Sequence, residues 1–200
     1  MAKGFDVSEN NGYVDFEQAA NEGYEFVIVR SSYGKSGKDE NFLDNVNRAH
    51  AAGLKVGAYH YSYALNPDDA LQEAQNCREV IDSAGVLLEL PVFFDMEDAD
   101  GYKARHGFDF SAGNITEICR VFLENIGLNC GVYASESWLD NYIDWQGLGC
   151  SVWNASWYSE QTEPNPDDNV DGIKGYMWQY TDKAYIAGKY LDADWIYGEV

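Results

Sequence analysis

Apolar and amphipathic segments alternate along most of the chain. Eight short segments have the apolar or alternating composition of strands: residues 4–8, 26–32, 55–62, 90–97, 131–135, 152–157, 175–181 and 190–197. Five segments between them have the apolar spacing of helices: residues 15–23, 42–53, 67–85, 114–127 and 137–143. Up to residue 157 strands and helices alternate, which is typical of a parallel sheet. We therefore predict an α/β fold in which eight strands and five helices form a barrel.

The pattern changes after residue 157. Residues 159–172 are polar and rich in turn-forming residues, and the last two predicted strands follow with no helix between them. Calcium binding by Asp167, Asp168 and Asp171 is one interpretation of this loop, but it lacks the glycine and glutamate placements of an EF-hand. Solvated turn residues are the better interpretation.

The fourth predicted strand, LPVFFDME (90–97), ends in two acids. Strand alternation puts Phe93, Asp95 and Glu97 on one face, and Val92, Phe94 and Met96 on the face that packs against helices. The two acids are then roughly 6–7 Å apart along the strand. One interpretation is that they simply meet solvent where the strand ends. The other is a pair of working carboxylates, as glycoside hydrolysis requires.

Two further acids support the second interpretation. Asp6 in the first strand and Asp192 in the last each alternate with apolar neighbours, so we expect both to point into the barrel. Closure of a barrel brings its first and last strands together, and active sites of such barrels lie at the C-terminal ends of strands. Burial beside like charges should keep one carboxyl of the group protonated. Glu97 has the longest side chain and the outermost position, so we assign it as the general acid.

Composition limits the partners. The chain has 200 residues, 34 acids and 13 basic residues, with a net charge of −21. We expect one domain over residues 1–200. Its negative surface should repel nucleic acid and anionic membranes. No apolar run approaches the ~18 residues of a membrane-spanning helix, and the N-terminus lacks the pattern of a signal peptide.

The four cysteines have no metal-like spacing. Cys130 and Cys150 each lie at the start of a predicted strand, so a disulfide between them is geometrically conceivable. Free thiols are the better interpretation, because a free cysteine behaves as a small apolar residue in such positions. We expect no metal site.

Eight short motifs occur in an order and spacing that resemble the glycoside hydrolase family 25 lysozymes, which are N-acetylmuramidases of bacteria and phages. They are GFDVSENNG (4–12), VIVRSSYG (27–34), VGAYHYS (56–62), FFDMED (93–98), GVYAS (131–135), WNASW (153–157), MWQYT (177–181) and LDADWIY (191–197). The resemblance implies a flattened (β/α)5β3 TIM-like barrel acting as a catalytic domain. The family's four acidic site residues fall on Asp6, Asp95, Glu97 and Asp192. One departure is Asp194, where the family more often has Asn.

This resemblance implies cleavage of the β-1,4 bond between N-acetylmuramic acid and N-acetylglucosamine in peptidoglycan. Glu97 would protonate the leaving oxygen. Three routes remain for the second step: direct attack by Asp95, attack by the substrate's own acetamido group oriented by Asp95, or inversion through an activated water. We favour the acetamido route, because Asp95 shares a strand with Glu97 rather than facing it across the cleft.

Aromatic and polar residues near the predicted strand ends are candidates for sugar binding, since aromatic rings present large apolar faces beside polar groups. The substrate-binding candidates are Arg30, Tyr59, Tyr61, Tyr133, Trp157, Trp178 and Gln179, with Tyr33 and Tyr180 nearby in the same motifs. His60 lacks a Ser or Cys partner motif, which favours a structural role over that of a catalytic base.

The expected partner is therefore the peptidoglycan of bacterial cell walls, with no cofactor. The expected place of action is outside the cell, and a phage endolysin would stay in the cytoplasm until release. The chain ends just past the last predicted strand, so we expect any wall-binding module to be absent from it. Two alternatives remain: an inactive carbohydrate-binding barrel, or a glycosidase for another N-acetylhexosamine polymer. The D-x-x-D-x-D-x-E run of chitinase-type barrels is missing from residues 88–97.

Overall fold

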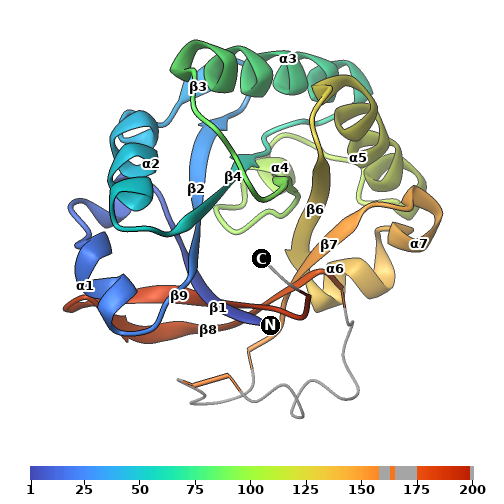
Figure 1. The fold of residues 1–200 in the computed structure, drawn as a ribbon. Helices are drawn as coiled ribbons and strands as arrows, with labels where there is room; N and C mark the ends of the chain where they lie inside the picture. Colours follow the sequence, from blue (N-terminus) through green and yellow to red (C-terminus); the bar gives the residue numbers. More distant parts are fainter. Residues whose placement is uncertain (158–162, 165–174, 199–200) are drawn as a thin grey trace.

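The computed structural model describes residues 1–157, 163–164 and 175–198, and its centre is a closed barrel (Figure 1). Eight strands follow one another around it in the order β1 (Ala2–Val7), β9 (Lys189–Ile196), β8 (Met177–Ile186), β7 (Ser151–Ala155), β6 (Cys130–Ser135), β5 (Val92–Asp95), β4 (Lys55–Tyr61) and β2 (Phe26–Tyr33). Pairing of β1 with β2 closes the ring. All neighbours are parallel except β9, which is antiparallel to both β1 and β8. The predicted α/β barrel of eight strands is confirmed.

A ninth strand, β3 (Gly37–Lys38), was not predicted. It adds two residues to the edge of β2 in antiparallel orientation and takes no part in the barrel. The β8–β9 pair is a hairpin whose turn has Ala187 and Gly188 at φ +48° and +82°, as a type I′ turn requires. No helix separates the last two strands, as predicted.

Helices cover the outside of the barrel (Figure 1). The five predicted helices are present as α1 (Phe16–Asn21), α2 (Phe42–Ala51), α3 (Pro67–Ala84), α5 (Ala112–Ile126) and α6 (Glu136–Asn141). The described residues also form α4 (Tyr102–Arg105), α7 (Trp145–Leu148) and a 3-10 turn at Glu9–Asn11. Elements this short span about one turn, so they leave no apolar periodicity in the sequence. Among the described residues, no helix combines the length and the apolar character needed to cross a membrane.

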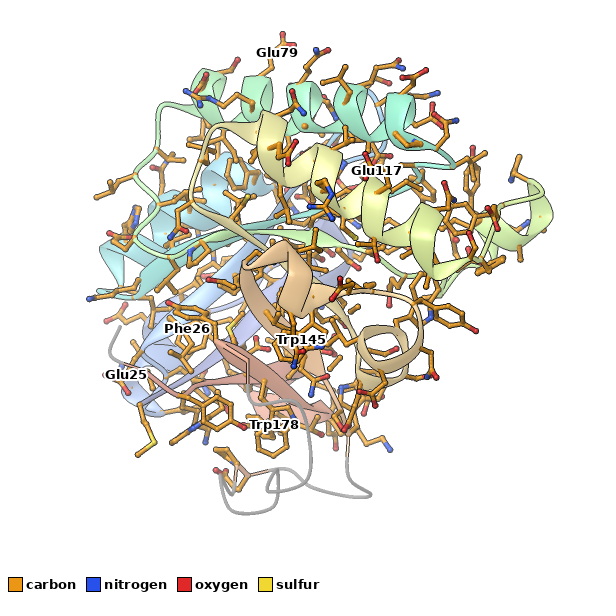
Figure 2. All side chains as sticks on the ribbon, turned by 90° about the vertical axis from the view of Figure 1, so that its right-hand side faces the viewer. Glu25, Phe26, Glu79, Glu117, Trp145 and Trp178 are labelled. Atoms are coloured by element: carbon orange, nitrogen blue, oxygen red, sulfur yellow. The ribbon has the colours of Figure 1, made fainter. Side chains whose placement is uncertain are left out.

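The longest helix, α3, has clear start and stop signals. The Asn66 side chain accepts a hydrogen bond from the Asp69 N–H, Pro67 occupies the first turn, and Gly85 ends the helix at φ +62°. The helix packs beside α5, and Figure 2 shows Glu79 and Glu117 pointing to solvent from these two helices.

Two apolar cores lie on the two sides of the barrel wall. Along β5 the side chains alternate as predicted: Val92, Phe94 and Met96 belong to the outer core under the helices, whereas Phe93 points inward. The inner core consists of Ala2, Phe26, Ile28, Leu90, Phe93, Trp153, Met177 and Ile196. These side chains fill the barrel below the C-terminal strand ends, so polar side chains have room only at that end.

All four cysteines are free thiols. Cys130 begins β6 and Cys150 directly precedes β7, its neighbour in the sheet, but no disulfide joins them. The three loop acids Asp167, Asp168 and Asp171 lie outside the described residues.

The close approach of β6 and β7 gives a test of the barrel wall. A Cβ at Gly131 would overlap the carbonyl group of Ser151 on the neighbouring strand. We expect Gly131→Ala to lower the free energy of unfolding by roughly 1–3 kcal/mol, the usual cost of overpacking. Urea unfolding followed by circular dichroism measures this change. Gly113→Ala on α5 is the control, because a Cβ there meets nothing within 4 Å. Equal stability of the two variants would contradict the tight packing of β6 on β7.

Candidate active site

A cavity of about 190 Å³ opens at the C-terminal ends of the barrel strands. All four predicted acids, Asp6, Asp95, Glu97 and Asp192, line it. Its other walls are Ser8, Asn10, Arg30, Tyr59, Tyr61, Tyr133, Trp153 and Gln179. Strand alternation explains the convergence, because each acid is an even number of residues from an inner-core residue of the same strand: Ala2 for Asp6, Phe93 for Asp95 and Glu97, and Ile196 for Asp192. The structure therefore brings together acids that are up to 186 positions apart in the sequence (Asp6 and Asp192).

The β5 acids lie in a poorly solvated environment. Burial and the nearby Glu97 raise the pKa of Asp95 well above its usual range, although the positive charges of Lys103 and Arg30 act against this. Burial also raises the pKa of Glu97, with Lys103 opposing and Asp192, Asp100 and Asp98 adding to the effect. Glu97 lies two residues beyond the end of β5, and its side chain still lines the cavity with that of Asp95. The site thus favours the protonated form of a carboxyl group.

Asp6 and Asp192 come together because β1 pairs with β9, with Phe5 opposite Ala193. Burial, followed by the charges of Asp192 and Asp194, raises the pKa of Asp6 well above its usual range. Burial raises the pKa of Asp192 to about 6, with a contribution from Asp182. The predicted perturbation of an acid in this group is present for each of its members.

Gln179 on β8 connects the acids to the aromatic wall. Its Nε2 donates to Asp6 Oδ2 at 2.8 Å and lies 3.5 Å from Asp192 Oδ2. Its Oε1 accepts from the Tyr133 hydroxyl at 3.0 Å and from Trp157 Nε1 at 3.2 Å. Because an amide nitrogen donates and an amide oxygen accepts, these contacts fix the orientation of the Gln179 amide, with its nitrogen toward the two carboxyl groups.

Arg30 is held by two carboxylates. Its Nε donates to Asp39 Oδ2 at 2.9 Å and its Nη2 to Glu9 Oε1 at 3.1 Å. Asp39 also accepts from the backbone N–H of Glu9 at 2.9 Å. The guanidinium group therefore ties the turn after β1 to β2 and still faces the cavity.

A second cavity, of about 480 Å³, continues the first. The two share Asn10, Arg30 and Tyr61 as walls. The remaining lining residues are Glu9, Tyr33, Tyr63, Ala99 and Asp100. Together the cavities form one continuous cleft that is lined by tyrosine side chains.

The model of Glycosyl hydrolases family 25 matches residues 5–189. The chain belongs to this family. It is 27% identical to the autolytic lysozyme of Clostridium acetobutylicum over 192 residues, which cover 96% of this chain and 54% of that protein. Among solved structures, the CTP1L endolysin has a TM-score of 0.78 at 26% identity, covering 98% of this chain and 66% of that chain. The LytC autolysin of Streptococcus pneumoniae has a TM-score of 0.79 at 24% identity, covering 96% and 45% respectively. The chain thus spans about half the length of the autolytic lysozyme.

The family 25 cleft contains most of the predicted aromatic residues. The cavity at the strand ends is lined by Tyr59, Tyr61 and Tyr133. Trp157 lies at its rim, with 52% of its surface exposed, and donates to Gln179. Tyr33 lines the second cavity.

Trp178 does not line the cleft, contrary to the prediction. Its side chain is fully buried in the outer core, as is that of Tyr180, and its Nε1 donates to the Ser156 carbonyl at 2.9 Å. Since Gln179 points inward, its two neighbours on β8 must point outward. The tryptophan that does line the cavity is Trp153 on β7, which was not predicted. Its alternation with outward-pointing Val152 was the available signal.

The side chain of Trp153 is held by Asp194 on β9. Its Nε1 donates to Asp194 Oδ1 at 2.8 Å, and Asp194 is fully buried. Oδ2 of Asp194 meets no hydrogen-bond partner among the described residues. Burial raises the pKa of Asp194 well above its usual range, the Trp153 hydrogen bond opposes this, and Asp192 adds to it. The buried position therefore favours the neutral carboxyl group, which has the shape and the acceptor oxygen of an amide.

His60 lies outside the cleft, in agreement with the predicted structural role. It is fully buried, its Nδ1 lies 2.8 Å from Ser32 Oγ, and its Nε2 lies 3.5 Å from Glu73 Oε2. The ring packs against Phe94 and Phe122 of the outer core.

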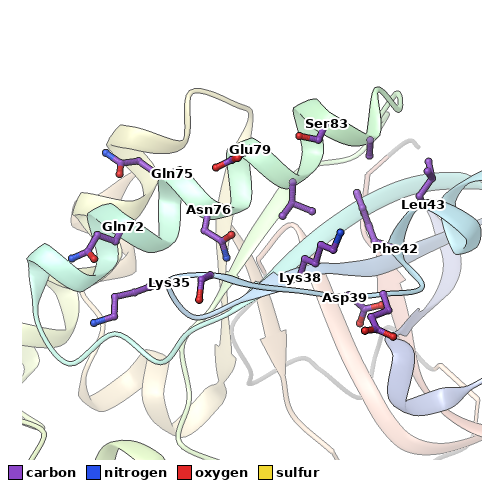
Figure 3. A pocket seen from close by; sticks show the side chains of 14 residues that line it. Lys35, Lys38, Asp39, Phe42, Leu43, Gln72, Gln75, Asn76, Glu79 and Ser83 are labelled. Carbon is purple, nitrogen blue, oxygen red and sulfur yellow. The ribbon is translucent and has the colours of Figure 1, made fainter.

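A further cavity, larger than the two that form the cleft, lies elsewhere on the molecule. A groove of about 780 Å³ runs between α3 and the segment from Lys35 to Leu43 (Figure 3). It shares no wall with the cavity at the strand ends and contains none of the four acids. The cavity at the strand ends is the candidate active site because it gathers the perturbed acids, although it is the smaller of the two.

The Asp194 environment predicts a pH-dependent gain of stability in Asp194→Asn. An unfolded Asp ionises near pH 4, whereas folded Asp194 keeps its proton to higher pH. The contribution of Asp194 to the free energy of unfolding therefore falls as the pH rises above about 4. Asn carries no proton to lose and retains the acceptor for Trp153. We expect Asp194→Asn to be more stable than the wild type at pH 7 and to lose that advantage toward pH 4. Thermal unfolding at both pH values measures it, with exposed Asp140→Asn as the control. A gain that is independent of pH would contradict the neutral form of Asp194.

Proposed function

We propose that this protein is a peptidoglycan hydrolase that cleaves the β-1,4 bond between N-acetylmuramic acid and N-acetylglucosamine. The observation that carries the proposal is the convergence of four carboxyl groups with raised pKa in one small cavity of a family 25 barrel. The names of its relatives support the same substrate, since they include an autolytic lysozyme and an endolysin. LytC was solved with a synthetic peptidoglycan ligand. On this proposal the protein acts on the bacterial cell wall, outside the cell.

Glu97 is the proposed general acid. It lines the strand-end cavity, and burial raises its pKa, which favours the protonated form that a general acid needs. The proton passes to the glycosidic oxygen as the bond from that oxygen to the sugar C1 breaks and the acetamido oxygen bonds to C1. In the second step water attacks C1 and displaces the acetamido oxygen, while the Glu97 carboxylate takes the proton of that water.

Asp95 is proposed to orient the acetamido group of the substrate. It is almost fully buried, and its Oδ1 meets no hydrogen-bond partner among the described residues. An acetamido N–H is a donor of the right kind for this oxygen, and the hydrogen bond would hold the acetamido oxygen ready to attack C1. Direct attack by Asp95 and inversion through water are the competing routes.

Asp6, Asp192 and Gln179 form the proposed polar wall opposite the β5 acids. Gln179 connects both carboxyl groups to Tyr133 and Trp157, so a sugar that touches the ring wall also meets the hydrogen-bonded acids. The other proposed sugar contacts are Arg30, Tyr59 and Tyr61. The tyrosines of the second cavity extend this surface for neighbouring sugars of the strand.

Clearing of a peptidoglycan suspension, with chitin assayed beside it, tests the proposal against its rivals. An inactive carbohydrate-binding barrel would bind without clearing either polymer, and a glycosidase for another N-acetylhexosamine polymer would act on chitin. We expect clearing of peptidoglycan alone. Retention of all four acids in the cavity favours the active enzyme over the inactive barrel.

Glu97→Gln keeps the shape of the side chain but removes its proton. We expect the rate of peptidoglycan cleavage to fall by at least about a hundredfold with the fold intact, in line with the usual contribution of general acid catalysis. Release of reducing sugar measures the rate, and circular dichroism checks the fold. Asp95→Asn should be nearly as damaging, while Asp194→Asn should change the rate little. Near-normal cleavage by Glu97→Gln would remove Glu97 from the role of acid.

The configuration of the new reducing end separates the routes of the second step. Participation of the acetamido group inverts C1 twice, so the β-anomer should form first. NMR spectra recorded immediately after cleavage, before the anomers equilibrate, give the answer. An α-anomer formed first would exclude every retaining route.

A further inference from the structure

A buried lysine lies directly behind the proposed catalytic pair. Lys103 on α4 is 1% exposed, and its Nζ donates to the main-chain carbonyl of Glu97 at 2.7 Å and to that of Ser62. Ser62 directly follows β4, and Glu97 follows β5. One ammonium group therefore joins the ends of two neighbouring barrel strands at the point where the acid emerges.

The turn between β5 and α4 fixes the position of this lysine. Asp98 Oδ1 accepts from the N–H of Lys103 at 2.7 Å, and Asp98 Oδ2 accepts from the N–H of Ala104 at 3.0 Å. Gly101 stands at φ +67°, a conformation that lets the chain reverse before the helix. The segment folds back on itself, so the lysine approaches Glu97 from behind while the carboxyl group faces the cleft.

The ammonium group is surrounded by acids. The titratable groups that face it are Glu73 on α3, Asp95 on β5, Glu97 and Asp98 after β5, and Cys119 on α5. Its charge lowers the pKa of Asp95 and of Glu97, against the larger opposite effect of burial. Asp95 and Glu97 also face Arg30, Asp100, Asp192, Asp6, Tyr59, Tyr61 and Tyr133.

Arg30 does not fill the role of Lys103 as a cation that lacks its own carboxylate partner. Its guanidinium group is already bonded to Glu9 and Asp39, whereas Lys103 bonds to neutral carbonyl groups. A buried cation opposes the effect of burial, which favours the neutral form of two adjacent carboxyl groups in a poorly solvated cavity. The proposed reaction needs one protonated group and one ionised acceptor.

We propose that Lys103 is a positioning residue for the hydrolysis: its ammonium group anchors the main chain at Glu97 and keeps the Asp95–Glu97 pair in the singly protonated state. The inference rests on the proposed function. It predicts that the charge of Lys103 determines the pH range of activity and that its hydrogen bonds determine the maximal rate.

Lys103→Met and Lys103→Gln separate these two effects. Both remove the charge, so both limbs of the pH profile of kcat/KM should move to higher pH by about one unit, the scale of a nearby buried charge. Gln can still donate to a carbonyl group, so it should retain more of the kcat than Met. Lys189→Met is the matched control, because Lys189 also donates to a main-chain carbonyl, that of Asn11, without facing the β5 acids.

Glu73→Gln gives an independent reading should the Lys103 variants fail to fold. Glu73 is a buried acid that faces Lys103; its Oε1 accepts from the Tyr63 N–H at 2.8 Å, a role that Gln keeps, and its Oε2 lies 3.5 Å from His60 Nε2. The substitution is made in a His60→Gln background and compared with that background, so that the imidazole charge does not change with it. Loss of the acid leaves the lysine charge less compensated, so both limbs should move to lower pH. Opposite shifts in the two sets of variants support the proposal.

NMR titration of the Asp95 and Glu97 carboxyl carbons in the same variants needs no turnover. It distinguishes failure of this inference from failure of the proposed function. Unchanged titration or an unchanged pH profile, with only a lower kcat, would make Lys103 a purely structural residue and overturn the proposal. Shifted titration in a protein that cleaves no peptidoglycan would retain the electrostatic role and overturn the proposed function instead.

Discussion

Closure of the barrel is the constraint on which the rest of the structure depends. β1 pairs in parallel with β2 on one side and antiparallel with β9 on the other, so the two ends of the chain complete one ring. This pairing brings Asp6 next to Asp192, and the other strands place Asp95, Glu97 and Gln179 around the same opening. An open sheet would leave these groups spread along a surface, where water would solvate each acid separately.

Bringing the four acids together in a poorly solvated cavity lowers the stability of the fold, and apolar packing in the rest of the barrel offsets this loss. Removal from water raises the pKa of each acid, and their mutual repulsion adds to it in all but Asp192, where Asp182 adds instead. The inner core of Phe26, Phe93, Trp153 and their neighbours, together with the outer core, supplies the apolar burial that offsets this cost. Perturbed acids held by a well-packed scaffold are typical of catalytic sites.

The polar contacts around the acids give each a different environment. Gln179 connects Asp6 and Asp192 to the aromatic wall, Lys103 lies behind Glu97, and one oxygen of Asp95 faces no described partner. Carboxyl groups of the same chemical type can therefore take different protonation states and different roles.

Much of the fold and the positions of the four acids can be predicted from the sequence, because strand alternation is a local property. The two-residue period of LPVFFDME correctly placed Phe94 and Met96 toward the helices and Asp95 toward the cavity. The apolar periodicity of the helices likewise predicted all five that exceed one turn. Asp6 and Asp192 were predicted to meet because their neighbours alternate in the same way and because a barrel must close.

The tertiary structure was needed for the groups at the cleft that the sequence analysis had misplaced or missed. Trp178 and Trp153 both lie on barrel strands, and only the side-chain direction set by each neighbouring residue puts one in the outer core and the other in the cavity. Lys103 had no sequence signal, because its helix is a single turn and its partners are main-chain carbonyl groups. Lysine side chains are mostly exposed in folded proteins, so the residue type alone predicts a position on the surface. Its position beside Glu97 depends on the hydrogen bond to Ser62 at the end of β4, which lies 41 positions earlier in the chain and meets Lys103 only in the folded state.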